Sequence, residues 1–384
     1  MAVKIVRQPK KIALIGAPSS AAAFLAGGEK APAALRAAGL VDRLKSAGYE
    51  VIDHGDCAPR LFADDEEHRR ARNLTEIVAG LNDLKTRAEV AIKSGALVLV
   101  LGGDCAQVIG LLTASRRYYK RVNLLWFDRD ADLNTPATTP SGRIDGMVVA
   151  HIIGRGAPEL VRFWGETPLV REPDVVLFGL ERVDPPEQEF LTRSPMRHVY
   201  AADILFKGGA KSASEALGLV HADAREFVLH LDTDVIAQED FAAVNVPGSG
   251  GLRFEDVRAA LKEIVRHKNL VGLDVAQYNP DKDPDGSAAK KLVDLIVEAL
   301  TARLESSDAP AAAAPAADAP VPDSAASDAI ASEAPDSDAP EAASPASEPF
   351  VEPSSVALLP GESPSAERPS EEPSPSEPSS TESA

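Results

Sequence analysis

The sequence predicts a three-layer α/β/α domain built on a mainly parallel sheet of about eight strands. Short runs rich in Val, Ile and Leu recur along the chain, and longer segments with helical periodicity lie between them. Continuous apolar strands that alternate with amphipathic helices are typical of a parallel sheet covered on both faces. Because no segment between Met1 and Glu305 resembles a linker, we expect residues 1–305 to form a single domain.

The expected elements follow one another in regular order. The strands are predicted at Lys11–Gly16, Tyr49–Asp53, Ala96–Leu101, Val122–Phe127, Asp174–Gly179, Arg197–Ala201, Phe227–Asp232 and Leu270–Asp274. The helices are predicted at Ala31–Ser46, Leu74–Lys93, Ala213–His221, Glu255–His267 and Ser287–Leu304.

The C-terminal segment, residues 306–384, has a different composition. It holds 16 of the 59 acidic residues, one of the 40 basic residues and 15 of the 30 prolines. Such a segment buries too little apolar surface to offset the entropy lost on ordering, so we expect a disordered acidic tail. Most of the formal charge of -19 therefore belongs to the tail, and the body is nearly neutral.

Composition also excludes several classes of partner. A nearly neutral body with an anionic tail offers no basic face for nucleic acid. No apolar run approaches the roughly 18 to 20 residues of a membrane span, and the N-terminus lacks the features of a signal peptide. Two cysteines, Cys57 and Cys105, are too few for a disulfide framework. We expect a cytoplasmic protein that binds neither nucleic acid nor membrane.

Polar residues follow directly after four of the predicted strands. In parallel α/β sheets such residues meet at the carboxyl edge, where ligands bind. The four segments are Gly102–Cys105, Asp128–Asp132, Leu231–Asp234 and Asp274–Pro280.

Five aspartates in these segments share a spacing of two residues, which places each set on one side of an extended backbone. They are Asp128, Asp130, Asp132, Asp232 and Asp234. Gathered carboxylates require a compensating positive charge, from divalent metal, arginine or protons, and a pair of divalent ions is the usual solution. The alternative is that these aspartates cap turns and helices after strands. We favour a metal site because two clusters and a GGDC segment follow separate strands.

A resemblance to a known family rests on the order of six segments. They are GGDC, DRDADLNTP, SGRIDG, GLERVDPPE, HLDTD and DVAQYNP, preceded by GAPSS at Gly16–Ser20 and EKAPAALR at Glu29–Arg36. In this order they resemble the arginase and agmatinase (ureohydrolase) family. The resemblance implies an arginase-like α/β/α fold, two Mn²⁺ ions that share a bridging hydroxide, hydrolysis of a guanidino group with release of urea, and assembly as a homotrimer or hexamer.

The resemblance also implies metal ligands. Asp128, Asp132, Asp232 and Asp234 match the four aspartate ligands of the family, whereas Cys105 and Asp130 stand where the family has histidines. A thiolate and a carboxylate both bind metals, so we expect all six residues to be ligands. His230 lies two residues before Asp232 and is interpreted as a structural residue or as a support for a ligand.

Two further positions depart from the catalytic pattern. Asp145 stands where the family has a proton-shuttling histidine, and Gln277 stands where it has the glutamate that pairs with the guanidinium. Together with Asp130, they are the predicted catalytic positions.

The positions matched to substrate binding predict an amino-acid-like ligand that carries a carboxylate and an amino group. They are Asn134, Thr139 and Ser141 for the carboxylate, Arg143 beside them, and Asp184 and Glu187 for the amino group. The alternative is that these residues simply build a tight loop.

Two functions remain open at this point. Asp130 and a thiolate at Cys105 add negative charge to the ligand set. Arg129 and Arg143 offset this charge in one of two ways, either together with bound metal ions or in place of them. The first hypothesis is a metal-dependent hydrolase of linear C–N bonds in a guanidino or amidine compound. The second is a catalytically inactive relative that acts as an assembly partner or a small-molecule-binding protein.

Overall fold

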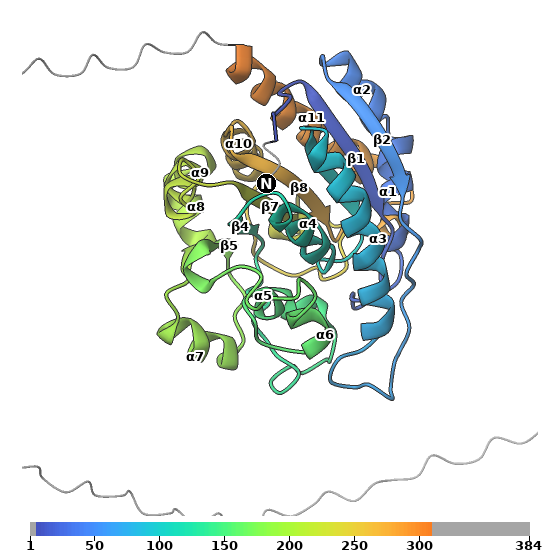
Figure 1. The fold of residues 1–384 in the computed structure, drawn as a ribbon, viewed down its shortest axis with the longest axis vertical. Helices are drawn as coiled ribbons and strands as arrows, with labels where there is room; N and C mark the ends of the chain where they lie inside the picture. Colours follow the sequence, from blue (N-terminus) through green and yellow to red (C-terminus); the bar gives the residue numbers. More distant parts are fainter. Residues whose placement is uncertain (1–4, 309–384) are drawn as a thin grey trace, which may run out of the picture. The chain divides into compact units, whose positions relative to one another are not determined.

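The computed structural model describes residues 5–308, of which 5–306 carry described side chains (Figure 1). The last helix ends at Asp308, three residues beyond the predicted domain boundary. The remainder of the predicted tail, 309–384, lies outside the described residues.

The described chain forms one sheet of eight strands, and every pair of neighbouring strands is parallel. The strands are β1 (Lys11–Ala17), β2 (Glu50–Asp56), β3 (Leu97–Gly102), β4 (Asn123–Phe127), β5 (Val175–Leu180), β6 (Arg197–Tyr200), β7 (Phe227–Asp232) and β8 (Leu270–Ala276). Their order across the sheet is β2-β1-β3-β8-β7-β4-β5-β6. The predicted parallel sheet is confirmed.

Helices connect the strands and cover the sheet (Figure 1). They are α1 (Ala31–Ala37), α2 (Leu40–Ser46), α3 (Leu74–Lys93), α4 (Gln107–Arg116), α5 (Val148–Ile152), α6 (Pro158–Val161), α7 (Pro185–Arg193), α8 (Ala201–Lys207), α9 (Gly209–Leu219), α10 (Phe254–Val265) and α11 (Ser287–Asp308).

The side chains of the central strands alternate between two hydrophobic cores. In β3, Leu97, Leu99 and Leu101 pack with α1, α2, α10 and α11, whereas Val98 and Val100 pack with α3 and α4. Because strand residues alternate between the two faces, a strand buried on both faces requires an unbroken apolar run. The three-layer architecture follows from this arrangement.

The helices differ from the sequence prediction in two ways: one predicted helix is divided, and α4 to α8 have no counterpart among the helices predicted above. The predicted helix over 31–46 is two helices, because the chain turns at Gly39, whose φ is 90°. The sequence did not predict α4, because its residues are buried all round except at its C-terminal end and it shows no polar face.

The strand order brings the polar segments together. β3, β8, β7 and β4 are consecutive neighbours in the sheet, and each is followed by one of the four predicted polar segments. The predicted meeting of these segments at one edge therefore has a direct structural basis.

Among residues 5–308, no helix is both long enough and apolar enough to span a membrane.

Gly103 fixes the loop that carries Cys105 from the end of β3 into the site. A Cβ atom at Gly103 would lie 1.7 Å from the backbone oxygen of Ser19, and the Gly103 carbonyl accepts the N–H of Gln277 at 2.7 Å. The close approach of three backbone segments therefore requires glycine at this position.

We expect Gly103→Ala to lower the free energy of unfolding by about 2 kcal/mol or more, because backbone atoms must move to admit the methyl group. Chemical denaturation of the purified protein measures this change. Gly146→Ala is the matched control, since a Cβ atom there meets nothing within 4 Å. Equal stability of the two variants would contradict the packing argument.

Candidate active site

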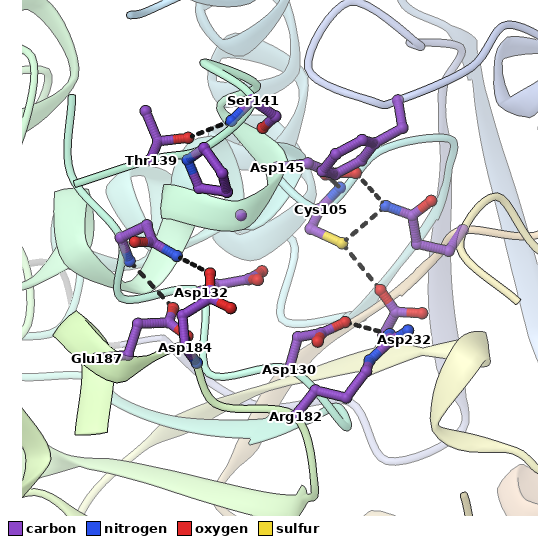
Figure 2. Close-up of a pocket in the computed structure, with 15 residues that line it drawn as sticks. Cys105, Asp130, Asp132, Thr139, Ser141, Asp145, Arg182, Asp184, Glu187 and Asp232 are labelled. Carbon is purple, nitrogen blue, oxygen red and sulfur yellow. Dashed lines mark hydrogen bonds and ion pairs between the residues drawn. The ribbon is translucent and has the colours of Figure 1, made fainter. Parts of the chain in front are cut away.

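A pocket of about 130 Å³ opens at the carboxyl edge of the sheet. Figure 2 shows side chains from the segments after β3, β4, β5, β7 and β8 turned toward it. Eleven of the residues predicted for the site line it. They are Cys105, Asp130, Asp132, Asn134, Thr139, Ser141, Asp145, Asp184, Glu187, Asp232 and Gln277.

Three predicted residues do not line this pocket. Asp128 and Asp234 are almost fully buried, and each belongs to a group of potential metal donors. Arg143 is directed elsewhere: its guanidinium donates to the carbonyl of Ala63 and to Asp64 and lies over the ring of Phe62. The prediction that Arg143 lies beside the ligand is not supported, because these contacts hold its charge outside the pocket.

Asp145, Cys105 and Gln277 form one hydrogen-bonded unit on the floor of the pocket. The backbone N–H of Cys105 donates to Asp145 Oδ1 at 2.8 Å, and Gln277 Nε2 donates to Asp145 Oδ2. The same amide group lies 3.3 Å from Cys105 Sγ. Gln277 adopts a positive φ of 66°, a strained conformation that places its side chain in this unit.

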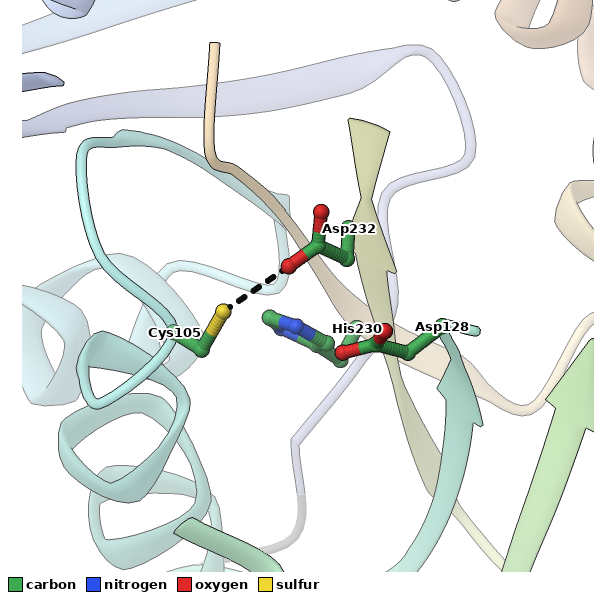
Figure 3. A group of neighbouring side chains, drawn as sticks. All are labelled: Cys105, Asp128, His230 and Asp232. Atoms are coloured by element: carbon green, nitrogen blue, oxygen red, sulfur yellow. Dashed lines mark hydrogen bonds between the residues drawn. The ribbon is translucent and has the colours of Figure 1, made fainter. Parts of the chain in front are cut away.

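A first group of potential metal donors consists of Cys105, Asp128, His230 and Asp232 (Figure 3). One donor atom from each residue lies within 4.8 Å of the others. All four residues are buried, and Cys105 Sγ lies 3.0 Å from Asp232 Oδ2 in a hydrogen bond. Asp132, predicted as a ligand, lines the pocket but does not belong to this group.

A second group consists of Asp128, Asp130 and Asp234. Here a cation of the protein is already present: Arg182 Nη2 donates to Asp130 Oδ2, and it donates to Asp234 Oδ2 at 2.5 Å. Figure 2 shows the Arg182 side chain beside Asp130. The guanidinium therefore compensates these carboxylates in the way a metal ion would.

The backbone sets the position of Arg182. Residues Asp130 and Arg182 form a parallel β-bridge beyond the ends of β4 and β5, and the N–H of Arg182 donates to the carbonyl of Arg129 at 2.8 Å. The side chains of bridged residues lie next to each other, so Arg182 meets Asp130 directly.

The two arginines that the sequence suggested for this role have other partners. Arg129 donates to Glu181 at 2.5 Å and to the carbonyl of Ser249 at 2.6 Å. Arg143 binds Asp64, as described above. The charge of Arg129 still lowers the pKa of Asp130 and Asp234, so this part of the expectation agrees with the structure. The sequence did not identify Arg182, which binds both carboxylates directly, because only the strand order shows that Arg182 adjoins Asp130.

Burial dominates the electrostatics of the remaining acidic groups. It raises the pKa of Asp128, Asp132 and Asp232 well above the ordinary value, and neighbouring carboxylates raise these pKa values further. Burial and the adjacent acids also raise the pKa of the Cys105 thiol. These buried acidic side chains are therefore more stable when they bind protons or a cation than when they carry uncompensated negative charge.

The residues matched to substrate binding also hold the local structure. Asp184 and Glu187 form the capping box of α7, and Glu187 Oε1 accepts the N–H groups of Leu133 and Asn134. Thr139 Oγ1 accepts the N–H of Gly142 at 3.0 Å. These residues therefore hold the loops together, as the alternative interpretation predicted. They also line the pocket, so the two interpretations are compatible.

Sequence reasoning gave no site role to Arg182 and did not include His230 among the metal donors. Both had a readable signal. Arg182 follows β5 within the same segment as Asp184, and His230 shares a strand face with Asp232 because the two are two residues apart.

We expect Arg182→Gln to lower the stability of the metal-free protein by about 2 kcal/mol, because Asp130 and Asp234 lose their shared cation. Denaturant unfolding in the presence of a chelator measures the change. The control is Arg193→Gln, which removes an exposed ion pair with Glu189 and should cost less than about 1 kcal/mol. A stability loss no larger than that of the control would show that Arg182 does not compensate these carboxylates.

Comparisons with known proteins agree with this geometry. The sequence model of the Arginase family matches residues 10–302. Arginase from Bacillus subtilis (strain 168) is 30% identical over 297 residues, which cover 77% of this chain and 99% of that protein. Arginase-1 from Rattus norvegicus is 32% identical over 277 residues, which cover 71% of this chain and 86% of that protein. A crystal structure of the Bacillus subtilis arginase superposes with a TM-score of 0.69 at 29% identity, covering 76% of this chain and 98% of that chain.

Proposed function

Because the chain belongs to the arginase family, we propose that it is a metal-dependent hydrolase. The bond that it cleaves is a linear C–N bond of a guanidino or amidine compound with an amino-acid-like head group. The observation that carries this proposal is the pocket itself: several potential metal donors, a buried acid and five of the six residues matched to substrate binding line one cavity.

The residues present fit a metal at one of the two donor groups. Cys105, Asp128, His230 and Asp232 lie close enough together to hold a divalent ion, and no arginine of the described chain forms an ion pair with them. A bound ion supplies Lewis-acid activation of the substrate and of water. At Asp130 and Asp234 the fit is poorer, because the Arg182 guanidinium is already bound there.

Asp145 is the group best placed to handle protons. It lines the pocket, and burial raises its pKa above the ordinary value. Proton exchange with a leaving nitrogen is the role that a buried acid in this position offers. The amide of Gln277 and the N–H of Cys105 hold both Asp145 oxygens in place for this step.

Gln277 favours a substrate group that donates hydrogen bonds. Its Oε1 is buried and has no hydrogen-bond partner among the described residues. A neutral acceptor binds an N–H without matching a full positive charge, so an amidine or amide suits it better than the guanidinium of arginine. Thr139 and Ser141 accept backbone N–H groups and keep their hydroxyl protons for a substrate carboxylate.

A second candidate function is small-molecule binding without catalysis. Arg182 favours it, because this guanidinium occupies the carboxylates of a second metal position. Two further expectations remain predictions: a cytoplasmic location, which rests on the composition of the sequence, and a homotrimer or hexamer, which rests on the family resemblance.

The test is release of urea or ammonia from guanidino acids, amidines and amides by the full chain loaded with Mn²⁺ or Zn²⁺. We expect turnover of at least one compound and a loss of 100-fold or more in kcat for Asp145→Asn, with a small change in KM, because the variant loses an acid that acts in the transition state.

Arg193→Gln serves as the control variant, since Arg193 is exposed and pairs only with Glu189 among the described side chains. It should keep full turnover. Calorimetric binding of one of these compounds with no turnover by the metal-loaded protein would favour the binding function and contradict the hydrolase.

A further inference from the structure

We propose that Cys105, Asp128, His230 and Asp232 form a site for a single zinc-class transition metal ion, and that the Arg182 guanidinium takes the place of a second ion. The proposal refines the metal of the hydrolase proposed above, but it concerns binding and is tested without turnover. Its novel elements are His230 as a ligand and a protein cation at the second position.

His230 has the features of a metal ligand rather than of a packed histidine. Its side chain is fully buried, and its Nδ1 lies 2.7 Å from the carboxylate of Asp274, to which it donates. The other ring nitrogen, Nε2, has no hydrogen-bond partner among the described residues. A buried, unpartnered lone pair costs free energy, and a metal ion removes that cost.

The neighbouring strands hold the His230 ring rigidly. His230 is paired in register with Trp126 on β4 and with Asp274 on β8. The Trp126 ring stacks on the imidazole at 3.8 Å between centroids, and Gln107 Nε2 donates to Asp274 Oδ2 at 3.1 Å. A carboxylate that fixes the far nitrogen of a histidine is the usual support of a metal ligand.

The donor atoms select the class of metal. A thiolate and an imidazole beside two carboxylates suit Zn²⁺ or Co²⁺ better than Mn²⁺, which prefers oxygen ligands. Donor atoms around a tetrahedral zinc ion lie about 3.3–3.6 Å apart. The donors here lie within 4.8 Å of one another, so small side-chain shifts complete the site. The Cys105 thiol donates its proton in a hydrogen bond to Asp232, and a bound ion would displace this proton.

The guanidinium at the second donor group holds the place of a second ion. Arg182 binds both Asp130 and Asp234, and Asp128 is the carboxylate that the two donor groups share. An ion at the first group and a guanidinium at the second therefore each offset part of the negative charge of the cluster. Cys105 and Asp232 also line the pocket, so the ion lies next to the substrate cavity.

The first experiment measures metal content of the full chain after chelation and reloading with excess Zn²⁺ or Mn²⁺. We expect one zinc ion per chain and weaker retention of Mn²⁺. Reloading with Co²⁺ should produce a thiolate-to-cobalt charge-transfer band that Cys105→Ser abolishes. Two ions per chain, or a cobalt spectrum without that band, would overturn the proposal.

The second experiment compares the Zn²⁺ affinity of matched variants. His230→Gln should weaken binding by tenfold or more, whereas His151→Gln should leave it unchanged, because both ring nitrogens of His151 are occupied by backbone groups. Asp132→Asn should change affinity by less than about threefold. A loss in Asp132→Asn with none in His230→Gln would show that the family's ligand pattern applies instead.

Two measurements keep the test valid if a variant folds poorly. Thermal unfolding of each metal-free variant identifies such a case. Asp274→Asn retains the imidazole and should still weaken Zn²⁺ binding by tenfold to a hundredfold through the loss of its support. An unchanged affinity in a folded Asp274→Asn protein counts against His230 as a ligand.

The results also separate this proposal from the hydrolase. One bound zinc ion without turnover of any guanidino or amidine compound would support the metal site and contradict the hydrolase. Turnover that requires two manganese ions would support the hydrolase and contradict the single-ion site.

Discussion

The repulsion among buried acidic side chains at one edge of the sheet is the constraint on which the site depends. Six aspartates and a cysteine meet there, and burial raises the pKa of each group. Such a cluster is stable only with protons, metal ions or basic side chains among its members. The contacts of Arg182, the thiol hydrogen bond of Cys105 and the amide contact of Gln277 all respond to this one requirement.

The two groups of potential metal donors meet that requirement in different ways. At Asp130 and Asp234 part of the compensation is internal, because Arg182 binds both carboxylates and its backbone forms a β-bridge with Asp130. Around His230 and Cys105 no basic side chain is bound, and a buried nitrogen has no partner among residues 5–308. This difference between the two groups is the basis for proposing a single metal ion in this member of the arginase family.

The pocket shows how catalytic and structural roles overlap on the same residues. Glu187 caps α7 and also lines the pocket, while Gln277 joins the backbone of β8 to the loop after β3. Substitutions at these positions will therefore change both stability and binding. The experiments on Asp145 and His230 are the most informative about function. The roles proposed for these two residues, proton transfer and metal binding, are chemical and not structural.

The sequence by itself determined the parallel sheet and the edge at which polar groups gather, because continuous apolar runs and the residues that follow them are local features. It also identified eleven of the pocket residues through the resemblance to the family. It left the helix break at Gly39 and the buried helix α4 unpredicted. Only the tertiary structure decided which cation meets which carboxylate, since Arg182 reaches Asp130 through the pairing of strands far apart in sequence, and a lone histidine becomes a candidate ligand only when its neighbours are known.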